Sequence, residues 1–173
     1  VRLAVEAGQV VSRSKQFKVI QASNHREGVR TGETLYFGSR ESQSMLRVYD
    51  KRLELQAKGR EDAASYGVRW ELEFKQGRAQ ACAKALLARD PEDWRAFLVG
   101  VLRSYVDFRQ ITKETEDEDR YRAPMLEWYA LLTEGFQKGR LTSEKQVQTL
   151  QNAKRWVVNA LTPMLAVICA TPG

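Results

Sequence analysis

Two short segments of the sequence place charged or phenolic side chains at every second position. These positions are Arg47, Tyr49 and Lys51 in the first segment, and Arg69, Glu71, Glu73 and Lys75 in the second. Because successive residues of a β-strand face opposite sides of a sheet, each set would share one face of a strand. The alternate positions of the second segment are apolar, and we expect them to cover a core.

If these two strands pair, one surface gathers a phenol, two carboxylates and several cations. Carboxylates hold hard divalent cations such as Mg²⁺ or Mn²⁺, and Arg or Lys neutralises negative charge that develops on a phosphate. A tyrosine oxygen can act as a covalent nucleophile, although its ordinary pKa of about 10 requires such neighbours at neutral pH. The set is therefore consistent with phosphoryl-transfer chemistry. The spacing is equally typical of a solvated face with cross-strand ion pairs, each worth about 0.2–1 kcal/mol.

Several other kinds of site are excluded by the sequence. The chain has one histidine, His25, in a polar loop where we expect a surface residue or a DNA contact. Its two cysteines, Cys82 and Cys169, are too far apart for a CxxC motif, and we expect both to be buried thiols in a reducing cytoplasm. No glycine-rich phosphate loop is present.

The pattern of apolar residues changes near residue 78. Before it, a weak helix is predicted over 1–12, strands are predicted at 16–20, 33–37, 43–51 and 68–75, and a short helix is predicted at 53–58. Short connections between consecutive strands favour an antiparallel sheet. After it, helices are predicted at 78–89, from Asp90-Pro91 to Tyr105, from Pro124, and from Ser143, with a mostly acidic loop at 113–120. We expect the first of these helices to carry Cys82, Leu86 and Leu87 on one side. The buried face of the second is expected to consist of Trp94, Phe97, Leu98, Val101, Leu102 and Tyr105. We therefore expect an α+β fold, with a β-rich part (1–78) packed by a helical part (79–173) and a polar catalytic face on the sheet.

Composition agrees with a folded domain that binds a polyanion. The chain has 173 residues, of which 43% are hydrophobic, and this excludes disordered and fibrous proteins. No apolar run approaches the roughly 18 residues of a membrane span. The formal net charge is +6, and residues 1–78 hold 15 Lys and Arg against 10 Asp and Glu. A basic half of this kind suggests nucleic acid as a partner.

Three motifs follow one another in a specific order. They are Gly32-Glu33-Thr34-Leu35-Tyr36-Phe37-Gly38-Ser39-Arg40, then Met45-Leu46-Arg47-Val48-Tyr49-Asp50-Lys51, and then Val68-Arg69-Trp70-Glu71-Leu72-Glu73-Phe74. This series resembles the replication initiation factor family, which comprises rolling-circle initiators of small plasmids and phages and relaxases of conjugative elements. The resemblance covers about residues 10–80 and extends to the helical remainder only as a general pattern.

The resemblance implies site-specific nicking and joining of one DNA strand at an origin, through a 5′-phosphotyrosine link that frees a 3′-OH. It implies Tyr49 as nucleophile with Arg47 and Lys51 beside it, and Glu71 and Glu73 as ligands of a divalent metal. It also implies phosphate contacts at Arg47, Lys51 and Arg69. From the basic loops and the charged strand, further DNA contacts are predicted at Arg26, Arg30, Arg40, Arg52 and Lys75.

The sequence departs from the family in one respect. The family carries an acidic strand upstream of the first motif, and nothing between Val1 and Arg13 matches it. Either the sequence begins downstream of that strand, or the metal site of this chain is incomplete. The sequence does not begin with Met, and we expect it to be part of a longer protein. The resemblance also implies a cytoplasmic homodimer that acts with a host helicase. The alternative is a non-catalytic module that binds origin DNA.

Overall fold

The computed structural model describes residues 1–139, 141, 151, 154–155 and 158–159. The chain divides into two compact units, Val1–Ser143 and Glu144–Gly173, and the description below concerns the first. Strands and helices are combined in this unit, which confirms the predicted α+β class. Cys169 and most of the helix predicted from Ser143 onward lie outside the described residues. The predicted division near residue 78 stays a prediction.

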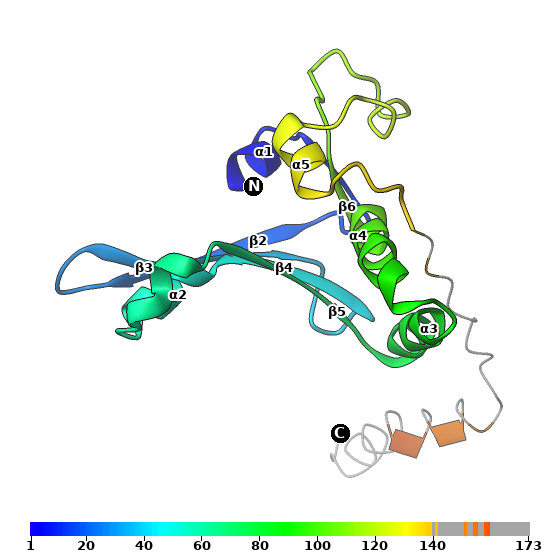
Figure 1. Ribbon diagram of the computed structural model, residues 1–173, viewed down its shortest axis with the longest axis horizontal. Helices are drawn as coiled ribbons and strands as arrows, with labels where there is room; N and C mark the ends of the chain where they lie inside the picture. The colour runs from blue at the N-terminus through cyan, green and yellow to red at the C-terminus, as the bar shows by residue number, and fades with distance from the viewer. Residues whose placement is uncertain (140, 142–150, 152–153, 156–157, 160–173) are drawn as a thin grey trace, which may run out of the picture. The chain divides into compact units, whose positions relative to one another are not determined.

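A four-stranded antiparallel sheet forms the first half of the unit (Figure 1). Its strands are β2 (Phe17–Asn24), β3 (Val29–Phe37), β4 (Ser44–Asp50) and β5 (Val68–Phe74), in that spatial order. All four strands were expected, but β2 and β3 extend further than predicted. Their additional residues pair from Gln21–Glu33 to Asn24–Val29, around a turn in which Gly28 has a φ of 66°. These residues are mostly polar and exposed, so they carry no apolar alternation from which a strand could be predicted.

One face of this sheet covers the core. Leu35, Phe37, Leu46 and Val48 are buried there, with Trp70 packed against them. The elements that cover this face are α1 (Arg2–Glu6), the end of α4 (Trp94–Tyr105), β6 (Val106–Phe108) and α5 (Glu127–Leu132). Figure 1 shows α1 and α5 on this side. The opposite face, called the outer face below, carries the alternate residues of each strand.

The second glycine of the first motif, Gly38, has a structural role in this packing. Gly38 follows β3 with a φ of 91°, and a Cβ there would lie 2.7 Å from the Tyr105 hydroxyl. That hydroxyl donates hydrogen bonds to the carbonyl oxygens of Phe37 and Ser44, at 3.1 and 3.0 Å. Glycine is therefore required both by the backbone conformation and by the approach of α4.

A second, two-stranded sheet was not expected. β1 (Val10–Ser12) pairs antiparallel with β6, so that Val11 lies opposite Asp107. The sequence predicted a weak helix over 1–12 and a helix that ended at Tyr105 with no strand after it. A three-residue strand whose residues are all buried has no alternation to detect.

The helices largely follow the predicted ranges, with local differences. α2 spans Lys51–Ala57, followed by η1 (Glu61–Ser65), and α3 spans Gln76–Leu87, followed by η2 (Pro91–Asp93). Cys82 and Leu86 pack against Phe97 and Val101, as the periodicity indicated. Leu87 was expected beside them but is 83% exposed, because it lies on the opposite side of the last turn of α3.

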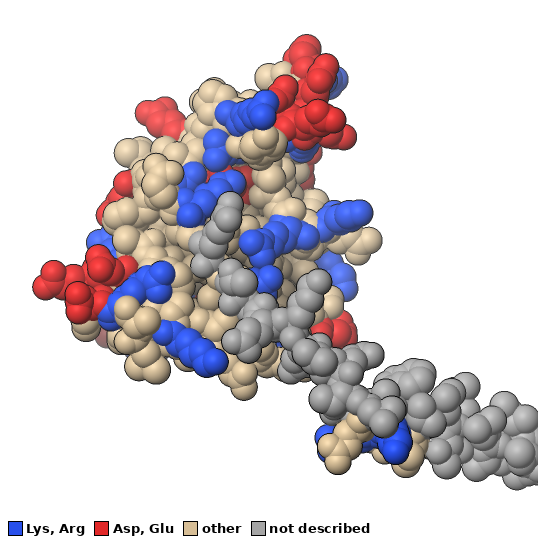
Figure 2. Space-filling model, turned by 90° about the vertical axis from the view of Figure 1, so that its right-hand side faces the viewer, with Lys and Arg blue, Asp and Glu red and all other residues tan. Residues whose placement is uncertain are grey.

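The connection between β6 and α5 contains the acidic loop predicted at 113–120, and its residues form turns. Figure 2 shows Asp and Glu side chains gathered at the top of one face, where Figure 1 places this loop, and Lys and Arg side chains spread across the middle of that face. Among the described residues, no helix is long and apolar enough to cross a membrane.

Candidate active site

The register of β4 and β5 brings the predicted reactive residues together on the outer face. Arg47 lies opposite Glu71, and Tyr49 lies opposite Arg69. Residues paired across an antiparallel sheet project to the same side. The alternation of the sequence is therefore realised, with Tyr49 half-buried on the side away from the core.

Glu71 is the centre of a hydrogen-bonded cluster. The Tyr49 hydroxyl donates to Glu71 Oε1 at 2.9 Å, and Arg47 Nε donates to Oε2 at 3.0 Å. Arg47 Nη2 contacts the same oxygen, and Arg69 Nη1 lies 3.7 Å from Oε1. The Arg47 guanidinium also lies 5.3 Å from the centre of the Tyr49 ring, within cation–π range.

The electrostatics keep Glu71 ionised. The hydrogen bond from Arg47 lowers the pKa of Glu71 below its ordinary value, and Tyr49 and Arg69 act in the same direction, while partial burial opposes them. An ionised carboxylate accepts hydrogen bonds and does not donate them. The 2.9 Å contact places this carboxylate where it can take the phenolic proton of Tyr49, although its lowered pKa makes it a weaker base than an ordinary glutamate. The sequence indicated Glu71 only as a metal ligand, and this contact adds a second possible role.

Lys51 lies near Tyr49, but it belongs to α2 and not to the strand in which it was predicted. The strand ends at Asp50, whose side chain caps α2 by accepting a hydrogen bond from the Leu53 amide at 3.0 Å. Lys51 is therefore the first residue of α2 and not the last residue of β4. Its ammonium lies 5.8 Å from the centre of the Tyr49 ring and 3.0 Å from Glu54 Oε2.

Glu73 shares the outer face with Glu71, two residues further along β5 and opposite Met45. It is exposed, and Lys75 Nζ lies 3.4 Å from its Oε1. Across the described residues, no three His, Cys, Asp or Glu side chains form a group that could hold a metal ion. Magnesium sites in phosphoryl-transfer enzymes use one or two carboxylates together with phosphate oxygens of the substrate. The two glutamates fit that donor chemistry, provided that DNA supplies the remaining ligands.

Comparison with known proteins identifies the family. A sequence profile described as replication initiation factor matches residues 1–171. The chain belongs to the replication initiation factor family. This confirms the resemblance seen in the three motifs.

Two proteins with similar sequence or fold are informative. The chain is 25% identical over 167 residues to a Bacillus subtilis (strain 168) protein named "Putative DNA relaxase NicK", covering 94% of this chain and 46% of that protein. The fold of this chain is similar to that of a rolling circle replication initiator protein from Geobacillus stearothermophilus, with a TM-score of 0.62 and 23% sequence identity. The match covers 83% of this chain and 51% of that protein. The chain thus spans about half the length of each.

The predicted DNA contacts lie at separate places on the chain. Arg69 lies beside Tyr49, whereas Lys75 and Arg40 lie together at the other end of β5, where Lys75 Nζ donates to the Arg40 carbonyl at 2.6 Å. Arg26 lies in the turn between β2 and β3. Arg30 forms an ion pair with Glu33, and Arg52 lies 3.7 Å from Asp50. Their roles stay predictions.

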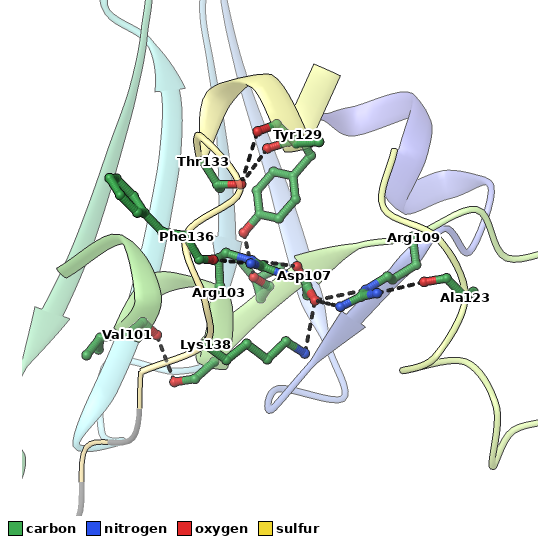
Figure 3. Close-up of polar contacts among 12 residues, drawn as sticks. Val101, Arg103, Asp107, Arg109, Ala123, Tyr129, Thr133, Phe136 and Lys138 are labelled. Carbon is green, nitrogen blue, oxygen red and sulfur yellow. Dashed lines mark hydrogen bonds and ion pairs between the residues drawn. The ribbon is translucent and has the colours of Figure 1, made fainter. Parts of the chain in front are cut away.

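Sequence reasoning missed a buried ionic cluster, which we call the Asp107 centre (Figure 3). Asp107 is 1% exposed. Its Oδ2 accepts a hydrogen bond from Arg109 Nε at 2.9 Å and lies 2.9 Å from Lys138 Nζ, and its Oδ1 lies 3.4 Å from Arg103 Nε. The available signal was two charged residues, Arg103 and Asp107, within the otherwise mostly apolar stretch 101–108.

Proposed function

We propose that this chain carries a DNA-nicking centre in which Tyr49 is the nucleophile and Glu71 accepts its proton. The proposal rests on one observation above all, the 2.9 Å hydrogen bond from the Tyr49 hydroxyl to a carboxylate that Arg47 holds ionised. A nucleophile within hydrogen-bond reach of a base that a third group orients is the general arrangement of covalent catalysis.

The chemistry balances as a transesterification. The Tyr49 oxygen forms a bond to phosphorus while the bond from phosphorus to O3′ breaks, and Glu71 takes the phenolic proton. The leaving O3′ takes a proton from solvent and becomes a free 3′-OH, while the 5′ end remains as a phosphotyrosine. Arg47, Arg69 and Lys51 lie close enough to Tyr49 to stabilise the charge on the phosphate oxygens.

A divalent metal belongs to the same proposal. Glu71 and Glu73 would hold Mg²⁺ or Mn²⁺ together with phosphate oxygens of the DNA, and the ion would neutralise charge on the phosphate. Removal of divalent ions with EDTA should then abolish nicking, and added Mg²⁺ should restore it. Nicking that persists in EDTA would contradict the metal requirement but would not affect the assignment of Tyr49 as nucleophile.

The nucleophile is tested by the Tyr49→Phe variant on supercoiled DNA that carries the origin of the protein's own genetic element. The wild-type chain should relax this DNA and leave a covalent protein–DNA adduct that survives denaturation with SDS. Tyr49→Phe should form no adduct while still retarding the DNA in a gel. A wild-type chain that retards the DNA without nicking would favour the non-catalytic module. The dimer, the helicase partner and the cytoplasmic location stay predictions of the family resemblance.

A further inference from the structure

A hollow of about 350 Å³ lies on the outer face beside Tyr49. Two small residues, Ala22 of β2 and Gly32 of β3, lie opposite each other in the sheet and leave space above the strands. The remaining lining residues are Thr31, Glu33, Thr34, Tyr36, Arg47, Tyr49, Asp50 and Glu54. The hollow therefore adjoins the proposed nucleophile and is closed at one end by α2.

Tyr36 supplies the aromatic surface of this hollow. The register of β3 and β4 places Tyr36 opposite Arg47 and Thr34 opposite Tyr49, so that Tyr36 and Tyr49 are diagonal neighbours on one face. The Tyr36 side chain is half-buried. In the described part of the chain, none of the aromatic ring pairs includes Tyr36.

Charge is distributed unevenly around the hollow. Arg47 and Arg69 lie on the side of β4 and β5, whereas Asp50 and Glu54 lie at the end closed by α2. Lys58 and Lys51 lower the pKa of Glu54 to about 2, so this carboxylate is ionised at neutral pH. A phosphate is attracted to the arginine side and repelled from the acidic end. A nucleobase carries no charge at neutral pH, so the acidic end of the hollow does not repel a base as it repels a phosphate.

We propose that this hollow binds a nucleobase of single-stranded DNA next to the phosphate attacked by Tyr49, with the base stacked on the Tyr36 ring. The inference rests on the proposed function, since it assumes a DNA strand at Tyr49. Stacking of bases on exposed aromatic rings is the usual way in which proteins hold single strands without reading their sequence. The base would fix the strand so that its phosphate lies between Tyr49 and the arginines.

The test measures binding of a 5′-fluorescein-labelled strand of twelve thymidines by fluorescence anisotropy, with the whole chain carrying Tyr49→Phe so that no cleavage interferes. Tyr36→Ala in this background should weaken binding by about 5- to 150-fold, because each stacked base contributes about that much. Tyr36→Phe should keep most of the binding, since the ring is kept and only the hydroxyl contact with Arg47 is lost. Tyr121→Ala removes a 52% exposed tyrosine that does not line the hollow, and it should have no effect.

A second variant fills the hollow without removing the ring. A Cβ at position 32 would lie 3.8 Å from the Ala22 Cβ, so Gly32→Val fits the strand and projects into the space. It should weaken binding as Tyr36→Ala does while thermal unfolding still shows a folded chain. Unchanged binding in both variants would overturn the inference, as would a loss in Tyr36→Phe equal to that in Tyr36→Ala.

The two proposals fail separately in these experiments. A chain that forms the adduct through Tyr49, but binds the strand equally well with and without the Tyr36 ring, has a nicking centre and no base site. A chain that depends on Tyr36 for binding, but still forms the adduct as Tyr49→Phe, has the base site and a different nucleophile.

Discussion

Two clusters in the described part of the chain, those around Glu71 and Asp107, each join one carboxylate to several cations but lie in opposite environments. Glu71 contacts Arg47, Arg69 and the Tyr49 hydroxyl on the outer face, with its side chain 32% exposed. Asp107 contacts Arg103, Arg109 and Lys138 with its side chain 1% exposed. The same kinds of ion pair can thus support chemistry where solvent and substrate have access, and hold structure together where they do not.

The contacts of the Asp107 centre indicate its structural role. Arg109 Nη1 donates to the Ala123 carbonyl at 2.7 Å, and Arg103 Nη1 donates to the Phe136 carbonyl. The centre therefore joins β6 and α4 to the two segments that flank α5. Beside it, the Tyr129 hydroxyl donates to the Val106 carbonyl at 2.8 Å, and burial, with Asp107 nearby, raises the pKa of Tyr129 above its ordinary value. Its groups are all satisfied within the protein, which leaves little capacity for a ligand.

The largest effect should come from breaking the buried cluster. Asp107→Asn leaves Arg103 and Arg109 buried without their counter-charge, and we expect a loss of about 3–5 kcal/mol in the free energy of unfolding. Urea denaturation measures this loss. Asp117→Asn is the control, because Asp117 is 97% exposed and 3.9 Å from Arg120, and it should leave the stability nearly unchanged. An Asp107→Asn protein as stable as the control would show that the centre does not hold these segments.

Breaking the exposed cluster around Glu71 should slow nicking and leave the free energy of unfolding nearly unchanged. Glu71→Gln keeps the size of the side chain but removes the base, and nicking should slow by at least about 10²-fold. Its stability should change by less than about 1 kcal/mol, because the ion pair is partly exposed. Single-turnover nicking and urea denaturation of the same preparation separate the two quantities. A large loss of stability, or normal nicking, would make the cluster structural.

A smaller effect should appear in the pH dependence of stability. The pKa of Glu71 is lowered in the folded chain, so its ion pairs stabilise the fold above the ordinary pKa of 4.5, and this contribution disappears as the pH falls through the lowered value. The difference between the wild type and Glu71→Gln should therefore be constant from pH 7 to about pH 5 and shrink below that. Urea midpoints across this range give the difference, and a gap that widens in acid would contradict the assignment.

The sequence predicted the outer face well because alternation of period two survives in β4 and β5. It predicted Arg47, Tyr49 and Glu71 on one surface, and the register of β4 and β5 places them there. It did not place Lys51, because the strand ended one residue early when Asp50 became a helix cap. Nor did it show Tyr36 in the site, since the motif around Tyr36 gives no register, and only the pairing of β3 with β4 puts this ring beside Arg47.

The buried cluster was beyond sequence reasoning for a different reason. Asp107 lies on β6, whose three residues show no period, and its partners come from positions up to 31 residues away. Apolar periodicity indicates which face of a helix or strand is buried and which faces solvent. It does not indicate a charged residue that is neutralised by ion pairs inside the protein. Helical spacing also predicted Trp94 and Leu98 in the core, but they are 39% and 43% exposed, because periodicity does not show how much of an apolar face the neighbouring elements cover.

The central claim is tested most directly by finding which residue carries the DNA after nicking. The adduct would be trapped on an origin oligonucleotide whose released 5′ fragment, which carries the new 3′-OH, is too short to remain bound. The adduct would then be digested and sequenced by tandem mass spectrometry. We expect the nucleotide to be attached to the Tyr49 phenol. Attachment to Tyr36, Tyr66 or any other residue would contradict the account.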